Sequence, residues 1–328
     1  MHNAITENQR PQGAALYIHW PFCKKKCPYC DFNSHVRDTV DQEAWRAALL
    51  SELRYWRERS TATMITSIFF GGGTPSLMPV STVEALLREV QQLWQVSDDL
   101  EVTLEANPTS VEAEKFAVLA SVGVNRVSLG VQSLRADALT FLGRELPDQT
   151  VGAWTTELQQ ALKLARGHLS LYQLTIEPNT AFHHLYHVQK HFDLPDEVRA
   201  SELYHATQEI MKAAGLPAYE ISNHAAAGQE SRHNLAYWRG DHYIGIGPGA
   251  HGRVADSAGI WATKNLPSPE RWLEAASGRL DEMMMLSETE RMEEKILMGL
   301  RLTQEGFDLN RLAVSERMAF EDRIADGR

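Results

Sequence analysis

Cysteine is scarce in this chain, which has only three among its 328 residues. An odd count, with no secretory h-region before it, excludes the disulfide framework of a small secreted domain. Long apolar runs are also missing, since no stretch approaches the about eighteen residues that predict a transmembrane helix. Residues 1–13 lack the basic flank of an export signal. We therefore expect a soluble protein of the cytoplasm, where thiols stay reduced.

Basic residues are fewer than acidic ones. The chain has 32 Lys and Arg against 43 Asp and Glu, which gives a formal net charge of −11. This balance argues against binding of nucleic acid, because phosphate contacts need a basic face. The local exception is the run of Lys24, Lys25 and Lys26. It is either a solvated loop, the interpretation that we favour, or a docking point for an acidic electron donor.

The cysteines lie together on one short segment, as Cys23, Cys27 and Cys30. Three such thiolates can hold three irons of a [4Fe–4S] cluster and leave the fourth iron without a protein ligand. An open coordination position is where a substrate or cofactor binds. A Cys3His zinc site completed by His19 or His35 is an alternative, although zinc knuckles usually pair two separated Cys-x-x-Cys motifs. Chance clustering of buried cysteines is a third interpretation.

Runs of strand length alternate with amphipathic helical patterns along the first half of the chain. The strand-like runs are residues 15–20, 65–70, 100–106, 125–131 and 169–176. One helical stripe between them contains Trp45, Leu49, Leu53 and Trp56. A second helix is predicted to begin with a capping box of Ser81 and Glu84. This alternation predicts right-handed βαβ units and a parallel sheet.

Unusual polar and glycine residues follow the predicted strands. "GGGTP", "EANP", "GVQS" and "TIEPNT" each lie at the carboxyl end of a strand, the edge at which parallel barrels build their active sites. We therefore predict an α/β fold, with a full or partial TIM-like (β/α) barrel from residue 15 to about 180. A smaller helical module follows from about residue 265, where Ser287 and Glu290 form another capping box.

The segment "YIHWPFCKKKCPYCDF", followed by "GGGTP", resembles the radical S-adenosylmethionine (SAM) enzymes. The resemblance implies that Cys23, Cys27 and Cys30 hold a [4Fe–4S] cluster whose free iron is chelated by SAM. Reduction of the cluster would then cleave the sulfonium to a 5′-deoxyadenosyl radical, chemistry that belongs to the cofactor.

The resemblance also assigns contacts to SAM. The residues concerned are Tyr17, Tyr29, Gly72, Gly73, Thr74, Glu105, Gln132 and Arg144. Glycine lets backbone approach a ligand closely, because no Cβ obstructs it. Taken singly, each polar residue could equally be an ordinary polar side chain at the end of a strand, and the glycines an ordinary strand-to-helix turn.

Within these enzymes the chain most resembles the oxygen-independent coproporphyrinogen III oxidases and, among them, the HemW haem chaperone family. Oxidases extend the cluster motif to a fourth cysteine, where this chain has Phe32. The pattern His-Asn-x-x-Tyr-Trp, associated with haem binding in the family, is formed by His233, Asn234, Tyr237 and Trp238. An imidazole can ligate haem iron and aromatic faces can pack a porphyrin. A buried His233 with a purely structural hydrogen bond is the alternative.

The HemW resemblance implies haem as bound cargo and haem-requiring proteins as recipients, respiratory proteins at the membrane among them. Decarboxylation of coproporphyrinogen III is the alternative activity, and a degenerate haem-binding relative is a third possibility. "YIGIGPGAHG" at 243–252 is expected to close over the cofactor, with His251 as a further candidate. A metal face of His183, His187 and His191 is conceivable, but we prefer a solvated surface, because relatives vary there.

One departure from the family pattern stands out. After "FLGR" at 141–144 the family has a further βα unit of roughly thirty residues, including an acid directed at the cofactor, but here "ELPDQT" follows directly. We therefore expect a barrel that lacks one unit. The domains predicted are a polar tail (1–14), the radical SAM core and its extension (15–240), and a part (241–328) with the Gly-rich loop and a shortened form of the family's C-terminal module.

Overall fold

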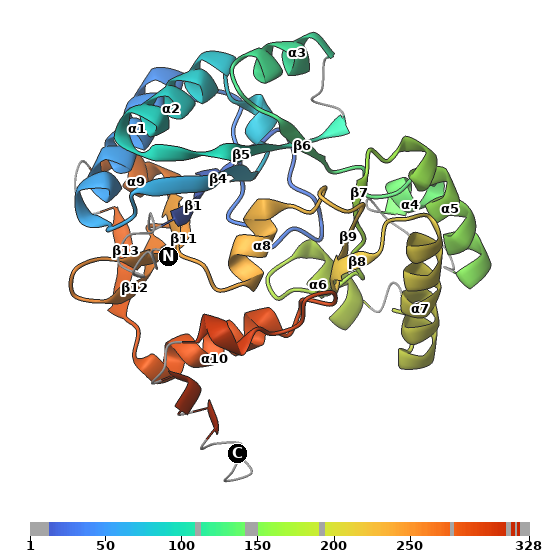
Figure 1. The fold of residues 1–328 in the computed structure, drawn as a ribbon. Coiled ribbons are helices and arrows are strands. Elements are labelled where there is room, and N and C mark those ends of the chain that lie inside the picture. The colour runs from blue at the N-terminus through green and yellow to red at the C-terminus, as the bar shows by residue number, and fades with distance from the viewer. Residues whose placement is uncertain are drawn as a thin grey trace.

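The computed structural model describes residues 13–108, 113–141, 150–189, 194–275, 279–312, 316–318 and 320–321. Its centre is an eight-stranded sheet in the order β13-β12-β11-β10-β1-β4-β5-β6 (Figure 1). The strands are β1 (Gly13–Trp20), β4 (Met64–Gly72), β5 (Gln95–Ala106), β6 (Arg126–Leu129), β10 (Tyr243–Ile246), β11 (His251–Ala255), β12 (Ile260–Asn265) and β13 (Leu280–Met285). The five strands from β10 to β6 are parallel, and β11 to β13 are antiparallel. The predicted α/β fold of a partial barrel is confirmed.

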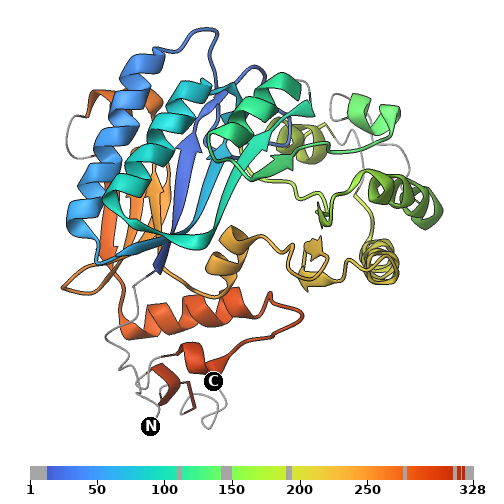
Figure 2. The same cartoon turned by 45° about the horizontal axis from the view of Figure 1, so that its top comes forward.

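Helices cover the outer face of this sheet. They are α1 (Gln42–Arg59), α2 (Val80–Leu93), α3 (Ala113–Ser121) and α9 (Pro269–Glu274), and Figure 2 shows α1 and α2 side by side along the strands. The predicted stripe of Trp45, Leu49, Leu53 and Trp56 is buried against the sheet. Each such side chain contributes about 1.5–3 kcal/mol by burial, so this stripe holds α1 in place.

The inner face carries a different set of elements. Helix α8 (Arg232–Trp238) lies against β4, and α10 (Glu288–Gly299) lies against α8. The predicted capping box of Ser287 and Glu290 at the start of α10 is present. The capping box predicted at Ser81 is wrong. Helix α2 begins at Val80 after Pro79, whose φ of −58° already suits helix entry, so Ser81 lies inside the first turn.

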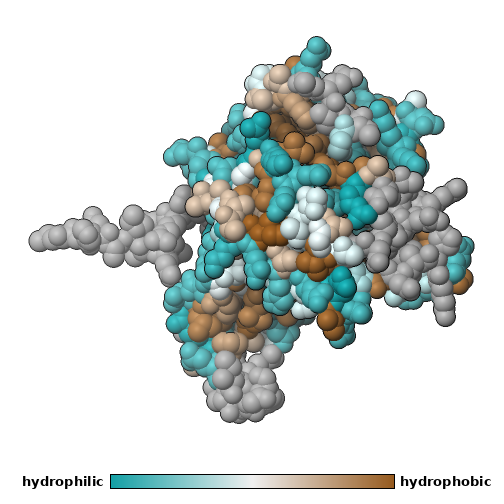
Figure 3. All heavy atoms as spheres, turned by 90° about the vertical axis from the view of Figure 1, so that its right-hand side faces the viewer, coloured by the Kyte–Doolittle hydropathy of each residue, from teal (hydrophilic) through white to brown (hydrophobic). Residues whose placement is uncertain are grey.

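A separate small unit follows β6. It contains α4 (Ala136–Phe141), α5 (Val151–Leu164), α6 (Ala181–His187), α7 (Glu197–Ala213) and a three-stranded antiparallel sheet. That sheet has the order β7-β9-β8, with β7 (His168–Ser170), β8 (Ala218–Glu220) and β9 (Asn223–Ala225). On the face in Figure 3, apolar side chains lie exposed among hydrophilic ones.

The strand predicted at 169–176 is mostly wrong. Only His168–Ser170 is strand, and it pairs with β9 instead of β6. The main sheet ends at β6, so the rest of the run has no neighbour in it, and Tyr172 is 72% exposed. The junction at which a βα unit is predicted to be missing, residues 142–149, lies outside the described residues.

The domain division at residue 240 stays a prediction. Strands β10 to β13, which come after it, belong to the same sheet as β1. Of the predicted tail, Gly13 and Ala14 form the start of β1, and residues 1–12 lie outside the described part. No helix within the described ranges is both long and apolar enough to cross a lipid bilayer.

Candidate functional site

The cysteine loop lies beside the carboxyl ends of β1 and β4. Cys23 ends the short strand β2 (Phe22–Cys23), which pairs with β3 (His35–Val36) and folds the loop back on itself. Cys23 is buried, whereas Cys27 and Cys30 are half-buried, and all three thiols are free. The backbone N–H of Cys30 donates to the carbonyl of Cys27 (3.2 Å) and forms a turn between them.

Hydroxyl groups accompany two of the sulfur atoms. Thr74 Oγ1 donates to Cys23 Sγ (3.4 Å), and Ser34 Oγ lies 3.5 Å from Cys30 Sγ. Burial raises the pKa of the Cys23 thiol, and the bond from Thr74 opposes this shift. The loop carries three free thiols, and hydroxyl donors beside them can stabilise thiolates. This arrangement fits a cluster that is held by three thiolates, each bound to one of its irons. Among the described side chains, no three His, Cys, Asp or Glu converge on a single metal ion.

Gly72 and Gly73 bring the end of β4 against this loop. Gly72 has a φ of 111°, and a Cβ on Gly73 would lie 2.7 Å from the carbonyl oxygen of Phe22. The N–H groups of Gly73 and Thr74 donate to the carbonyls of Trp20 (2.7 Å) and Phe22 (2.9 Å). The glycines are therefore required by the close approach of the cysteine loop, and they leave Thr74 next to Cys23.

Glu105 stands at the carboxyl end of β5, beside these glycines. It is half-buried, and burial raises its pKa to about 7 against the hydrogen bond that it accepts from the N–H of Gly72 (3.2 Å). A carboxylate with unused acceptor capacity in this position fits a ligand ammonium group. Burial also raises the pKa of Tyr17, whose hydroxyl bonds to the ring of His19.

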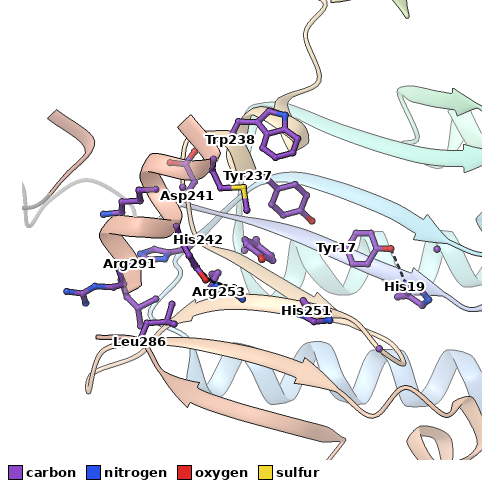
Figure 4. Close-up of a pocket in the computed structure, with 18 of the residues that line it drawn as sticks. Tyr17, His19, Tyr237, Trp238, Asp241, His242, His251, Arg253, Leu286 and Arg291 are labelled. Atoms are coloured by element: carbon purple, nitrogen blue, oxygen red, sulfur yellow. Dashed lines mark hydrogen bonds and ion pairs between the residues drawn. The ribbon is translucent and has the colours of Figure 1, made fainter. Parts of the chain in front are cut away.

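A cavity of about 550 Å³ opens from these residues (Figure 4). Tyr17, Gly72 and Glu105 line one end of it, and Tyr237 and Trp238 from α8 line another part. This volume is in the range of about 300–1,000 Å³ typical of small-molecule and cofactor sites. One cavity thus joins two predicted groups of residues that the sequence separates by more than a hundred positions.

Helix α8 is held by a carboxylate from the sheet. Glu101 of β5 accepts hydrogen bonds from Ser231 Oγ (3.3 Å) and from the backbone N–H groups of Arg232 (3.2 Å) and His233 (3.1 Å). Arg126 Nη1 donates to the same carboxylate at 3.3 Å. A negative charge at a helix N-terminus is stabilising, so Glu101 sets the position of α8 relative to β5.

The four residues of the His-Asn-x-x-Tyr-Trp pattern point to different places. His233 is 1% exposed, and both ring nitrogens are engaged, Nδ1 with Ser67 Oγ and Nε2 with the Tyr237 hydroxyl (both 2.9 Å). Burial lowers the pKa of His233 to about 3. The Asn234 side chain donates to the Tyr219 hydroxyl (3.4 Å) of the small sheet, away from the cavity. Tyr237 and Trp238 line the cavity itself.

Other predicted contacts lie outside the cavity lining. Tyr29 packs near Phe182 of α6, with 6.1 Å between ring centroids, and burial raises its pKa. Gln132 follows β6 with a positive φ of 69° and is exposed. Arg144 and His191 lie outside the described residues. Their predicted roles, like those of the other site residues, stay predictions.

The positioning role of two residues, Asn33 and His19, could not be found from the sequence, which offered His19 only as an alternative zinc ligand. Asn33 Nδ2 donates to the carbonyls of Pro248 and Pro267 (both 2.9 Å), which ties the cysteine loop to the turns around β11 and β12. His19 Nε2 donates to the Asn33 carbonyl (2.9 Å), so its Nδ1 accepts from Tyr17. Burial lowers the pKa of His19 to about 4. Nothing in the sequence signals bonds that span more than two hundred residues.

Comparison with known proteins agrees with this arrangement. Residues 17–168 match the sequence model of the Radical SAM superfamily. The chain is 37% identical over 326 residues to the Bos taurus protein named "Radical S-adenosyl methionine domain-containing protein 1, mitochondrial", covering 88% of this chain and 73% of that protein. It is 39% identical over 269 residues to the Escherichia coli protein named "Heme chaperone HemW", covering 73% of this chain and 70% of that protein. The chain belongs to the HemW-like family of radical SAM proteins.

Membership of the radical SAM superfamily implies a [4Fe–4S] cluster and SAM. The fold of the HemW-like chain also matches the solved structure of E. coli coproporphyrinogen III oxidase (HemN), with a TM-score of 0.74 at 20% identity over 96% of this chain and 82% of the other. At this identity the match concerns the fold alone.

Proposed function

We propose that this protein is a haem chaperone that holds a [4Fe–4S] cluster on Cys23, Cys27 and Cys30, binds SAM beside it, and carries haem for delivery to other proteins. The observation that carries the proposal is the single cavity that continues from Glu105 to the aromatic residues of α8. Two HemW proteins among the relatives, at 39% and 37% identity, support haem as the cargo.

The residues divide the work between cluster, cofactor and cargo. Thr74 donates to Cys23 Sγ and stabilises its thiolate form. Glu105 is placed to accept a hydrogen bond from the SAM ammonium, and Tyr17 lines the same end of the cavity. When bound, the cluster and SAM supply one-electron cleavage of the sulfonium. The rings of Tyr237 and Trp238 offer apolar faces to a porphyrin. The guanidinium carbon of Arg301 lies over the Trp238 ring, 4.4 Å from its centroid, and this cation–π contact stabilises the position of the ring.

Haem-requiring proteins, respiratory ones at the membrane among them, are the proposed recipients, and the cytoplasm is the proposed compartment. Coproporphyrinogen oxidase activity is the alternative. Phe32 argues against it, because the side chain is 61% exposed and lines the cavity where the oxidase motif has a fourth cysteine. An apolar ring at this point offers packing area to a cargo and no ligand to a metal.

The test is an anaerobic titration of the cluster-reconstituted protein with haem, combined with assays of 5′-deoxyadenosine and of carbon dioxide release from coproporphyrinogen III. A chaperone binds haem and releases no carbon dioxide. Trp238→Ala should weaken haem binding about 2- to 10-fold, whereas Trp154→Phe, on α5 and bonded to Thr207, should leave it unchanged. Failure of the reconstituted protein to bind haem would overturn the proposal, and carbon dioxide release would identify an oxidase.

A further inference from the structure

We propose that His251 is the residue of this chain that ligates the haem iron. This inference rests on the proposed function and names the ligand within the same cavity. Iron in haem proteins takes axial ligands from His, Cys, Met or Tyr side chains. The question is therefore which of these side chains line the cavity with a free donor atom.

Hydrogen bonding removes several candidates. His233 is buried with both ring nitrogens bonded. His19 lines the cavity, but its two nitrogens bond to Asn33 and Tyr17. The Tyr237 hydroxyl is bonded to His233. Ligation by any of these groups would break an existing bond in a buried environment, which costs about 1–3 kcal/mol for each partner left unpaired.

Met298 and Tyr243 also line the cavity. A thioether suits iron less well than an imidazole, and burial raises the pKa of Tyr243, which keeps its hydroxyl protonated. Two cavity-lining imidazoles remain. His242 and His251 both line the cavity, and within the described residues neither has a hydrogen bond to its ring nitrogens. They lie at opposite ends of the parallel strands. His242 precedes β10, next to the amino end of β1, where its carbonyl accepts from the N–H of Ala15. His251 opens β11 at the opposite, carboxyl-end side, which is the side of the cysteine loop.

The strand register gives the level of His251. Tyr17 pairs with Gly245 across β1 and β10, and Tyr243 pairs with Arg253 across β10 and β11. Counting two residues along each antiparallel strand places His251 opposite Gly245, and hence level with Tyr17. In Figure 4 His251 lies between Arg253 and the pair of Tyr17 and His19. An iron ligated there would lie between the SAM end of the cavity and the rings of α8.

Charge around His251 suits ligation. Burial, together with the cations Lys264 and Arg253, lowers the pKa of the imidazole, with Glu282 opposing them. The neutral ring that results keeps the lone pair that binds iron. His251 is also exposed, so cargo can reach it without movement of the sheet.

The test compares His251→Ala with His242→Ala, the competing imidazole of the same cavity, and uses His205→Ala, on the exposed side of α7 and outside the cavity lining, as the control. Each cluster-reconstituted protein is titrated with ferric haem, followed by the Soret band and by haem EPR. His251→Ala should lose the imidazole-ligated spectrum and bind haem at least about tenfold more weakly, the lower limit for loss even of an outer-shell partner at a metal site. Free imidazole added to this variant should restore the spectrum. His242→Ala should keep the imidazole-ligated spectrum, and His205→Ala should bind haem as wild type does.

The possible results separate the ligand from the function. If wild type binds haem and His251→Ala keeps its spectrum and affinity, the ligand assignment is wrong while the chaperone proposal stands. Loss of the spectrum only in His242→Ala would likewise overturn the assignment to His251. If His251→Ala keeps haem but loses the change in cluster EPR that SAM produces, His251 belongs to the SAM end and the proposal fails. If wild type does not bind haem, the proposed function itself fails.

Discussion

Glu105 shows how burial changes the chemistry of one carboxyl group. Its pKa rises from an ordinary 4.5 to about 7 because burial disfavours the charged form more than the hydrogen bond from the N–H of Gly72 favours it. The folded protein therefore binds this proton more tightly than the unfolded chain does. The stability that comes from the protonated form is fully present below pH 4.5 and is lost as the pH rises to about 7.

Replacement of Glu105 by Gln should remove this dependence. The variant keeps an acceptor for Gly72 and carries no charge, so its stability relative to wild type should rise between pH 4.5 and pH 7 and level off above. The gain should reach roughly 3 kcal/mol at most. Urea unfolding at pH 5, 6, 7 and 8 measures it. Glu209→Gln, on the exposed side of α7, should stay within about 0.5 kcal/mol of wild type. A difference for Glu105→Gln that does not change with pH would contradict the prediction.

His233 should contribute chiefly to stability. His233→Ala leaves Ser67 and the Tyr237 hydroxyl without their buried partner and opens a void under Phe69, whose ring stacks on the imidazole at 5.0 Å. We expect a loss of about 3 kcal/mol in the free energy of unfolding, measured by urea titration at pH 7. The exposed His184→Ala should change it by less than about 0.5 kcal/mol. Equal stability of the two variants would show that His233 is dispensable to the fold.

At the level of single residues, the sequence predicted the chemistry better than the placement. The spacing of Cys23, Cys27 and Cys30 predicted one loop, and that loop is present. The pattern around His233 predicted a group of residues for haem, but the side chains of Asn234 and Tyr237 point to different surroundings. Which way a side chain points depends on neighbours such as Ser67, which no local pattern specifies.

Helix α8 depends on one carboxylate that comes from another element. Glu101→Ala would leave the start of α8 and the Arg126 guanidinium without their shared acceptor. Loss of one partner of a buried ionic network costs about 3–5 kcal/mol. Because Arg126 is partly exposed, we expect about 3 kcal/mol, measured by urea unfolding, together with weaker haem binding, because Tyr237 and Trp238 lose their position.

The matched control is Glu305→Gln. Glu305 pairs with Arg239 through two hydrogen bonds of 2.7 and 2.8 Å, but this pair is exposed. Exposed ion pairs contribute about 0.2–1 kcal/mol, so both stability and haem affinity should change little. If Glu101→Ala were as mild as this control, α8 would be held by packing alone.

Elements with a strong local pattern were predictable, and those that depend on a distant partner were not. The stripe of Trp45 and Leu49 follows the helical period, and β1, β4, β5 and β6 are apolar runs of strand length. The run at 169–176 looks the same locally. It is mostly not a strand because the sheet has no adjacent strand to pair with it. The start of α2 was predicted wrongly because Pro79 is the N-cap of the helix, which leaves Ser81 inside the first turn.

The molecule as a whole combines a central sheet of eight strands with a smaller unit that contains a sheet of three short strands. Strands β1, β4 and β5 are paired on both sides and covered by buried side chains, whereas β7, β8 and β9 have three residues each. The unit also exposes large apolar residues: Leu164, Tyr172, Val188 and Val198. Local opening needs less free energy where few apolar side chains are buried.

Native-state hydrogen exchange should therefore divide the chain into two classes. Amides of β1 and β4 should exchange only through global unfolding, and those of β7 to β9 should exchange through local opening at lower free energy. Addition of urea at low concentration separates the two routes, because only global opening is strongly accelerated. The same free energy for both sets of amides would show that the protein opens as one cooperative unit.

The two strands that pair with β1 are synthesised at very different times. On one side β1 pairs with β4, which follows soon, but on the other side Ala15 pairs with Tyr243 of β10. At about 5–20 residues per second, a ribosome needs about 10 to 50 s to produce the second partner. During that interval one edge of β1 has unpaired backbone N–H and C=O groups, which can pair with other chains. We therefore expect the nascent chain to need chaperones that shield this edge.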